Sequence, residues 1–496
     1  MSRAETGHEG DIRLPRTLGF VSTTALVVGS VIGTGVFLKA AVMTQLVGRA
    51  SLVLCAWVIS GIFSFAGAMV YAELGTLFPN AGGEYVYLRA SYGDAVAFCY
   101  GWMRLLVGSS GIIASLGVGF AIFSSALLSG NTVWLQETFN VFGHQLKWQF
   151  GLQQVIAIGI ILTVSAVNVL GVAIGGHIQS FLTLLKCLSI VAIVVAVFRY
   201  SNAASWSHLA LSSSSPSTSS AFATAVLAAL WAYNGWNQMP MVAGEVQDPS
   251  RNISKALIVG MGIVLVLYLF ANLAYFIQLP ASQIATSSST QYPDALPVAS
   301  RVAFEIAGSA GLKLISVIFI ISTLGALHGT ILTSARVPFA MARDGLFFPS
   351  VGAINGRTRV PLVSIGLQAA WACLLAISGT FDQLTDYVIF TSWIFYGLAG
   401  FSIFLLRHKV RAQATAYRTP CYPLFPLTFV VFAIWLLFST LKTRPVGSLA
   451  GVLLTLSGLP VYGYVRRAYA RRLRDSALLE TSMQADGTIL IAKELS

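Results

Sequence analysis

Long apolar segments recur along the chain and are separated by short polar stretches. A helix needs about twenty residues to cross a bilayer, and hydrocarbon offers a backbone amide no partner outside its own helix. Twelve segments meet this requirement, at residues 17–45, 50–78, 94–128, 151–172, 177–199, 220–246, 253–279, 310–342, 361–379, 382–407, 424–442 and 446–466. The pattern predicts an all-α polytopic membrane protein with twelve transmembrane helices.

Composition supports this interpretation. Of the 496 residues, 56% are hydrophobic and 10% are charged, whereas soluble domains have about 25% charged residues. A soluble protein of this composition would lack the polar surface that water requires. Membrane lipids are therefore expected to surround most of the chain.

The positive charges indicate how the chain is oriented. Twenty of the thirty lysines and arginines fall in segments on the side of the N-terminus, and eight fall on the other side. Such an excess marks the cytoplasmic side. We expect both termini to be cytoplasmic, in a cell inner (plasma) membrane, with tails at 1–16 and 471–496 around a membrane domain at 17–470. The net charge of +12 then reflects topology, and no nucleic-acid partner is expected.

Two of the predicted spans are interrupted. In the first, Gly33 and Gly35 flank Thr34 near the middle of the apolar run, and each glycine weakens a helix by about 1 kcal/mol relative to alanine. In the sixth, Asn234 and Gly235 favour a turn, and Pro240 removes a helical hydrogen bond. Close packing through small residues explains the first interruption alone, but it does not explain the amides and the proline of the second.

The two interruptions occupy corresponding positions in two halves of the chain. Paired broken helices of this kind are the best sequence indication of a transporter's midplane site. A broken helix exposes N–H groups, which attract a carboxylate, and C=O groups, which attract an ammonium. The pattern therefore favours a carrier of zwitterions over a channel or a receptor. No Walker A, GxSxG or HExxH motif indicates an enzyme, and no metal or cofactor is expected.

An ordered set of motifs resembles the amino acid–polyamine–organocation (APC) superfamily over residues 17–465, and within it the L-type amino acid transporters and their bacterial relatives. The two broken spans and the ends of spans 2 and 8 carry the resemblance, together with the start of span 11. The motifs are Val31-Ile32-Gly33-Thr34-Gly35-Val36-Phe37, Ala72-Glu73-Leu74-Gly75, Pro79-Asn80-Ala81-Gly82-Gly83-Glu84-Tyr85, Trp231-Ala232-Tyr233-Asn234-Gly235-Trp236-Asn237, Ser334-Ala335-Arg336, Ala342-Arg343-Asp344-Gly345 and Tyr417-Arg418-Thr419-Pro420.

The resemblance implies a leucine-transporter-like fold. Residues 17–199 and 220–407 would form a five-plus-five inverted repeat, followed by two further helices at 424–466. It implies that the N–H groups of Thr34 and Gly35 bind the substrate carboxylate. The carbonyls of Val31, Ile32 and Trp231 would bind its ammonium, and Trp231 would also be an aromatic gate. The remaining expected site residues are Gly33, Ser110, Ala232, Asn234 and Asn237.

Asn234 bears on the substrate. Family members that carry cationic amino acids can have an acid at this position, and an amide cannot neutralise a basic side chain. We therefore expect neutral L-amino acids of unspecified size, with a cationic amino acid or polyamine carrier as the alternative. No cysteine lies at 129–150, where eukaryotic L-type light chains join a heavy chain covalently, so no such partner is expected.

Lys186 lies within span 5, about 15 Å past His177 by helix rise. An ammonium at this depth needs an interior partner. In the sodium-independent members that the chain resembles, a lysine here replaces a sodium ion and bridges the first break, near the Gly33 carbonyl, to a span 8 hydroxyl, which Ser322 matches. This implies sodium-independent transport and leaves exchange, facilitated diffusion and proton coupling open.

Two further buried polar residues have no role implied by the motifs. Arg104 is expected to pair with Glu73 or with a carbonyl, and His328 is expected to be a hydrogen-bonded structural histidine. Glu73, Glu84 and Glu245 are expected at cytoplasmic helix ends, as gate or capping contacts.

Overall fold

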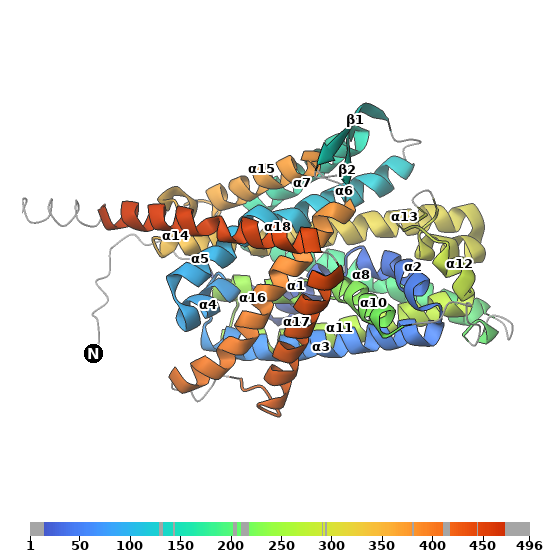
Figure 1. Cartoon of the computed structure of the whole chain (residues 1–496), viewed down its shortest axis with the longest axis horizontal. Coiled ribbons are helices and arrows are strands. Elements are labelled where there is room, and N and C mark those ends of the chain that lie inside the picture. The colour runs from blue at the N-terminus through green and yellow to red at the C-terminus, as the bar shows by residue number, and fades with distance from the viewer. Residues whose placement is uncertain are drawn as a thin grey trace, which may run out of the picture.

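The computed structural model describes residues 14–471, except 128–131, 142–143, 202–205, 210–217, 290, 293–294, 379–380, 410–416 and 444. Long helices run roughly side by side through most of the molecule (Figure 1). Ten helices in this part of the chain are long and apolar enough to cross a membrane. The prediction of a polytopic helical membrane protein is therefore confirmed.

The helices of the first half are α1 Phe20–Val31, α2 Gly35–Val47, α3 Ala50–Leu77, α4 Glu84–Tyr92, α5 Asp94–Met103, η1 Arg104–Gly108, α6 Ser109–Leu127, α7 Leu152–Val169 and α8 Val172–Tyr200. Those of the second half are α10 Ser219–Ala232, η2 Trp236–Glu245, α11 Pro249–Gln278, α12 Ala281–Ala285, α13 Val298–Ser334, α14 Arg336–Arg343, η3 Pro349–Gly352, α15 Leu362–Ser378, α16 Phe381–Lys409, α17 Leu424–Thr443 and α18 Pro445–Leu456.

The predicted spans correspond to these elements with shifts of a few residues at most ends. The eighth span differs more, because it was predicted from residue 310 and α13 begins at Val298, with a kink at Ala307 and Gly308. Two of the predicted spans are not among the ten long helices. One is the sixth, which consists of the short α10 and η2, and the other is the ninth, which is α15. The count of twelve spans and the inverted repeat stay predictions.

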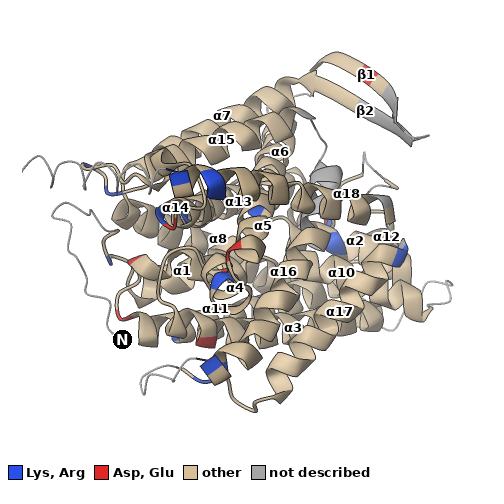
Figure 2. Ribbon diagram, turned by 60° about the vertical axis from the view of Figure 1, so that its left-hand side comes forward, with Lys and Arg blue, Asp and Glu red and all other residues tan. Residues whose placement is uncertain are grey.

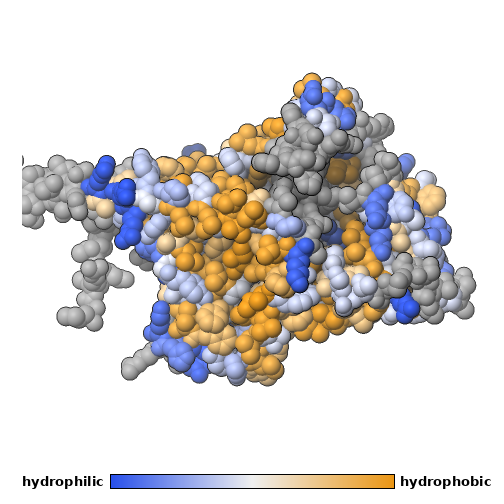
Figure 3. All heavy atoms as spheres, viewed as in Figure 1, coloured by the Kyte–Doolittle hydropathy of each residue, from blue (hydrophilic) through white to orange (hydrophobic). Residues whose placement is uncertain are grey.

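The helices around α1 form the interior of the molecule. α1 packs against α8, α11, α13 and η2, and from Leu26 to Ser30 all of its residues are buried. By contrast, α8 leaves large apolar side chains such as Phe181, Leu184 and Val195 exposed. A broad hydrophobic band crosses the visible face (Figure 3), and charged residues lie mostly toward the helix ends (Figure 2). This distribution fits a surface whose middle faces lipid.

A β-hairpin follows α6 and corrects the expectation of a purely helical chain. Its strands are β1 Val133–Val141 and β2 His144–Gly151, paired antiparallel with Gln136 opposite Gln149. The hairpin projects from one end of the helices (Figure 1). The indole nitrogen of Trp148 donates to the Ile377 carbonyl at 2.8 Å and ties the hairpin to α15. The segment is too short and too polar to cross the membrane, and two paired strands satisfy its backbone outside it.

Candidate functional site

The first break separates α1 from α2 at Ile32–Thr34. Ile32 leaves the helical conformation with ψ 89°, and Thr34 is the residue before α2. The amide of Gly33 turns back to the Val31 carbonyl at 2.8 Å. The break therefore exposes the carbonyl end of α1 and the amide end of α2 to the same interior space.

The second break separates α10 from η2 at Tyr233–Gly235. The amide of Asn234 donates to the Trp231 carbonyl at 3.1 Å, and Gly235 has φ +128°, which L-residues rarely adopt. Pro240 lies within η2, which is a 3-10 helix. The Asn-Gly pair and the proline thus act where the sequence predicts, because the turn needs glycine and the proline prevents a regular α-helix.

The two breaks touch each other. A Cβ atom added at Gly235 would lie 2.5 Å from the Ser30 carbonyl oxygen, and one added at Gly35 would lie 2.6 Å from the Cβ of Ala232. Both glycines therefore allow an approach that no side chain would permit. The ends of four half-helices converge at this point.

Tyr268 of α11 joins the breaks and was not identified from the sequence. Its hydroxyl lies 2.9 Å from the Val31 carbonyl oxygen and 3.0 Å from the Ala232 carbonyl oxygen. A buried hydroxyl needs a partner, and here it lies between the carbonyl ends of α1 and α10. A tyrosine in mid-span was the only sequence signal, and it does not distinguish such a bridge from an aromatic in the core.

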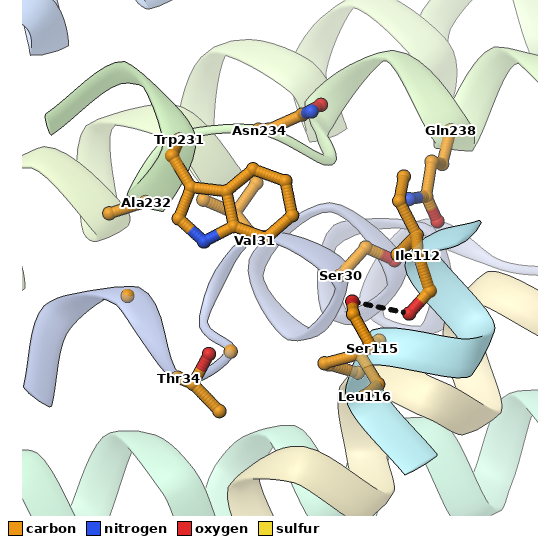
Figure 4. Close-up of a pocket in the computed structure, with 13 residues that line it drawn as sticks. Ser30, Val31, Thr34, Ile112, Ser115, Leu116, Trp231, Ala232, Asn234 and Gln238 are labelled. Carbon is orange, nitrogen blue, oxygen red and sulfur yellow. Dashed lines mark hydrogen bonds between the residues drawn. The ribbon is translucent and has the colours of Figure 1, made fainter. Parts of the chain in front are cut away.

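A pocket lies between the breaks, α6 and α13 (Figure 4). It offers about 40 Å³ to the centre of a water molecule, which is room for only a few waters. Trp231 extends its ring across the pocket from α10, and Lys39 of α2 lies 6.0 Å from the centre of that ring. The residues that line the pocket are Ser30, Val31, Gly33, Thr34, Gly35, Ile112, Ser115, Leu116, Trp231, Ala232, Asn234, Gln238 and Ala326.

Six of the predicted site residues share this pocket with Asn234, which accepts a hydrogen bond from the Tyr396 hydroxyl at 3.1 Å. Ile32, Ser110 and Asn237 are buried but do not line it. The predicted set also omitted Ser115 and Gln238. Their helices were recognised as spans, but weak periodicity in an apolar bundle does not show which face is turned inward.

Lys186 is buried and lies against the first break. Its Nζ donates to the carbonyls of Gly29 and Ile32, each at 2.8 Å. Ser322 donates to the Ile32 carbonyl at 3.3 Å and to the Gly33 carbonyl at 3.2 Å. The lysine and the serine thus meet at the carbonyl of Ile32, which accepts from Lys186, while the single hydroxyl proton of Ser322 serves either this carbonyl or that of Gly33. The assignment of the Ile32 carbonyl to the substrate stays a prediction.

A buried ion pair joins η2 to α14. Arg336 binds Glu245 through two hydrogen bonds of 2.7 and 3.0 Å, and both side chains are buried. The amide of Leu18 donates to the Glu245 carbonyl at 3.0 Å, and the amide of Gln247 donates to the Leu18 carbonyl at 2.9 Å. The chain before α1 is therefore held on the same end of η2.

The expectations for Arg104 and His328 have different outcomes. The pairing of Arg104 with Glu73 is wrong, because Glu73 binds Arg407 through two bonds of 2.7 Å and accepts from the Thr419 amide at 2.6 Å. His328 has its Nδ1 at 3.1 Å from Oε1 of Gln179, as expected for a hydrogen-bonded structural histidine.

Comparison with known proteins supports the resemblance. The family model of the amino acid permeases matches residues 18–458. The serine/threonine exchanger SteT of Bacillus subtilis (strain 168) is 32% identical over 92% of this chain and 98% of its own length. The mouse b(0,+)-type amino acid transporter 1 is 25% identical over 93% of this chain and 90% of its own length. The mouse large neutral amino acids transporter small subunit 2 is 28% identical over 91% of this chain and 81% of its own length.

Family match, helical spans and site geometry agree. The matched region contains both breaks, the pocket between them and the lysine beside it. The chain therefore belongs to the amino acid permease family, and it is a multi-pass membrane transporter of amino acids and not an enzyme.

Proposed function

We propose that the protein exchanges small neutral L-amino acids across the cell inner (plasma) membrane, by alternating access and without sodium. The observation that carries this proposal is the contact of Lys186 with the carbonyls of Gly29 and Ile32. Its substrate would lie in the pocket between the two breaks, and both termini would be cytoplasmic. The described residues before α1 contact η2 on one side of this pocket.

The substrate carboxylate is assigned to the amide end of α2, at Thr34 and Gly35. The first N–H groups of a helix lack partners within it and carry partial positive charge. Both residues line the pocket. A carboxylate bound there would be stabilised without any basic side chain.

The substrate ammonium is assigned to the carbonyl ends of α1 and α10, at Val31 and Trp231. Both residues line the pocket. Tyr268 has a single hydroxyl proton and lies near two carbonyls. If it donates to Ala232, a lone pair of the Val31 carbonyl becomes available to the ammonium. Ile32 is left out, because it does not line the pocket and its carbonyl accepts from Lys186.

Sodium independence follows from the charge of Lys186. Carbonyls of an unwound transmembrane helix are the groups that coordinate sodium in transporters with broken helices. Here the ammonium of Lys186 lies 2.8 Å from two of them. A second cation beside it would be repelled strongly in the low dielectric of the interior. A fixed ammonium would thus do structurally what a bound sodium ion does.

The residues around the pocket favour a substrate whose side chain is small and neutral. Its lining includes the uncharged polar residues Ser30, Ser115 and Gln238 and the aliphatic Ile112 and Leu116, and no acid or base is among the described residues that line it. A relative with 32% identity is named a serine/threonine exchanger, which supports short side chains. We propose serine, threonine and alanine as substrates, with no covalently bound heavy chain.

The substrate class can be tested on the unmodified protein and on the isosteric variant Asn234→Asp. We expect serine, threonine or alanine to raise the melting temperature of the purified protein, and lysine or arginine to leave it unchanged. A ligand at a hundred times its Kd stabilises by about 2.7 kcal/mol. Asn234→Asp keeps the acceptor for Tyr396 and adds one negative charge at the pocket. In this variant, lysine or arginine should become stabilising. The measurement is a thermal-shift screen of the twenty amino acids on both proteins.

The outcomes test the neutral substrate class and the role of Asn234 separately. Stabilisation of the unmodified protein by basic amino acids would contradict the neutral class and favour a cationic carrier. An identical profile for both proteins would remove Asn234 from the side-chain pocket while leaving the rest of the site intact.

A further inference from the structure

A buried polar cluster lies beside η2, and its members do not line the pocket. Its members come from α3, α4, α5, η1 and η2, and each is fully buried or nearly so: Tyr71, Glu84, Tyr100, Arg104 and Asn237. It contains one carboxylate and one guanidinium. Charges in such a setting cost several kcal/mol each unless they are paired and hydrogen-bonded.

Glu84 is well satisfied. Its Oε1 accepts from the Tyr71 hydroxyl at 3.1 Å and from the Asn237 amide at 2.8 Å, and its Oε2 accepts from the Tyr100 hydroxyl. Burial raises the pKa of the Glu84 carboxyl, and the three hydrogen bonds that it accepts oppose this shift by favouring the charged form. Of these three, only Asn237 belongs to the broken sixth span.

Arg104 is poorly satisfied. It is 1% exposed and begins the π-helix η1, and its guanidinium extends along the helix toward Gly108 at the other end of η1, where an added Cβ would lie 3.6 Å from Nη1. Its Nη2 is 3.9 Å from the Met241 sulfur, a weak acceptor. Among the described residues, its Nε and Nη1 have no hydrogen-bond partner. Each buried donor left unpaired costs roughly 1–3 kcal/mol.

The proposed alternating access would move η2. Asn237 of η2 binds Glu84, and the Met241 carbonyl accepts from the Gly82 amide at 2.8 Å. Both contacts would break if η2 swung away from α4, because Glu84 begins α4 and Gly82 lies just before it. Glu84 would lose one donor, while Arg104 would lose only its contact with sulfur and still have free donors.

We propose that Glu84 and Arg104 are positioning residues for transport. Glu84 holds η2 in its present position through Asn237, and Arg104 replaces Asn237 as a donor to the carboxylate when η2 moves. The exchange of donors keeps the buried carboxylate paired in both positions and so lowers the free energy of opening. The inference rests on the proposed alternating access, because it assigns these residues to the movement and not to substrate binding.

Two substitutions distinguish these roles, because they are expected to change the deuteration of η2 in opposite directions. Arg104→Met keeps an unbranched apolar stem and removes the replacement donor. We expect maximal exchange of labelled serine in proteoliposomes to fall about tenfold, which corresponds to about 1.4 kcal/mol, with substrate affinity unchanged. Asn237→Leu removes the tether of η2. Hydrogen–deuterium exchange of residues 236–245 should become faster in Asn237→Leu and slower in Arg104→Met.

Matched controls make the result specific. Arg104→Lys keeps the charge and should restore at least half of the lost exchange rate. Arg199→Met makes the same substitution at an exposed arginine at the end of α8 and should change neither the exchange rate nor η2 deuteration. Glu84→Gln leaves the guanidinium uncompensated and should lower the melting temperature, and adding Arg104→Met to it should recover part of that loss.

Several results would overturn the proposal. They are a normal exchange rate in Arg104→Met, a loss of affinity that parallels the loss of rate, and deuteration of η2 that changes in the same direction in both variants. Absence of amino acid exchange in the unmodified protein would contradict the proposed function instead. The measurement of hydrogen–deuterium exchange needs no substrate, so it tests the positioning role independently of the proposed function.

Discussion

Replacing Lys186 with methionine is expected to reduce amino acid exchange about a hundredfold or more. Methionine has a similar length but cannot donate, so the carbonyls of Gly29 and Ile32 lose their bonds to Nζ. Hydrogen bonds to a charged group contribute about 1.5–3 kcal/mol each. Without them the unwound segment has no cation to hold its carbonyls, and the adjoining amide end of α2 is no longer fixed. The measurement is the initial rate of serine exchange in proteoliposomes.

Lys255→Met is the matched control for this experiment. Lys255 is exposed on α11, and its replacement should leave the exchange rate within the scatter of the unmodified protein. Elution of Lys186→Met as a folded species in size-exclusion chromatography would show that the loss concerns transport. An exchange rate in Lys186→Met close to that of the unmodified protein would contradict the role of the lysine at the first break.

The second large effect is expected from Gly235→Ala. Gly235 has φ +128°, and an added methyl carbon would lie 2.5 Å from the Ser30 carbonyl oxygen. An L-residue there carries backbone strain, and overpacking of a core costs about 1–3 kcal/mol. Relief requires the sixth span to move away from α1, which separates the two ends of the site. Substrate binding and exchange should both be lost, as measured by thermal shift and by proteoliposome uptake.

Gly262→Ala tests whether any added methyl group has this effect. Gly262 lies inside α11, and a Cβ there would have no other atom within 4 Å. Alanine favours a helix over glycine, so this variant should retain full exchange. Undiminished substrate binding by Gly235→Ala would show that the close contact of the breaks is dispensable.

The sequence predicted the breaks well because their causes are local. Gly33, Gly35, Gly235 and Pro240 act through backbone freedom and a missing amide hydrogen, and these effects need no knowledge of the neighbours. Lys186 was likewise identified from its depth in an apolar run, because an ammonium there needs a partner anywhere in the fold.

The rest depends on tertiary contacts. The Ile32 carbonyl was assigned to the substrate, but Lys186 and Ser322 approach it from α8 and α13. Arg104 was expected to pair with Glu73 or with a carbonyl, but Glu73 binds Arg407 from α16, more than 300 residues away. Partners at such separations follow from helix packing, and a bundle that is apolar on most faces gives little periodicity from which to infer it.

The hairpin was missed for a different reason. Residues 133–141 and 144–151 lie between two long spans, and a polar connection of this length is usually assigned to a loop. Two short strands that pair with each other do not need an apolar run of membrane-spanning length, so the search for spans did not detect them.

The effect of sodium on exchange shows whether Lys186 stands in place of a sodium ion at the first break. Proteoliposomes loaded with unlabelled serine should take up labelled serine at the same rate in sodium chloride and in choline chloride, because the Lys186 ammonium lies 2.8 Å from the two carbonyls at the first break. Empty liposomes give the background. Uptake that occurs in sodium chloride and falls to background in choline chloride would contradict the account.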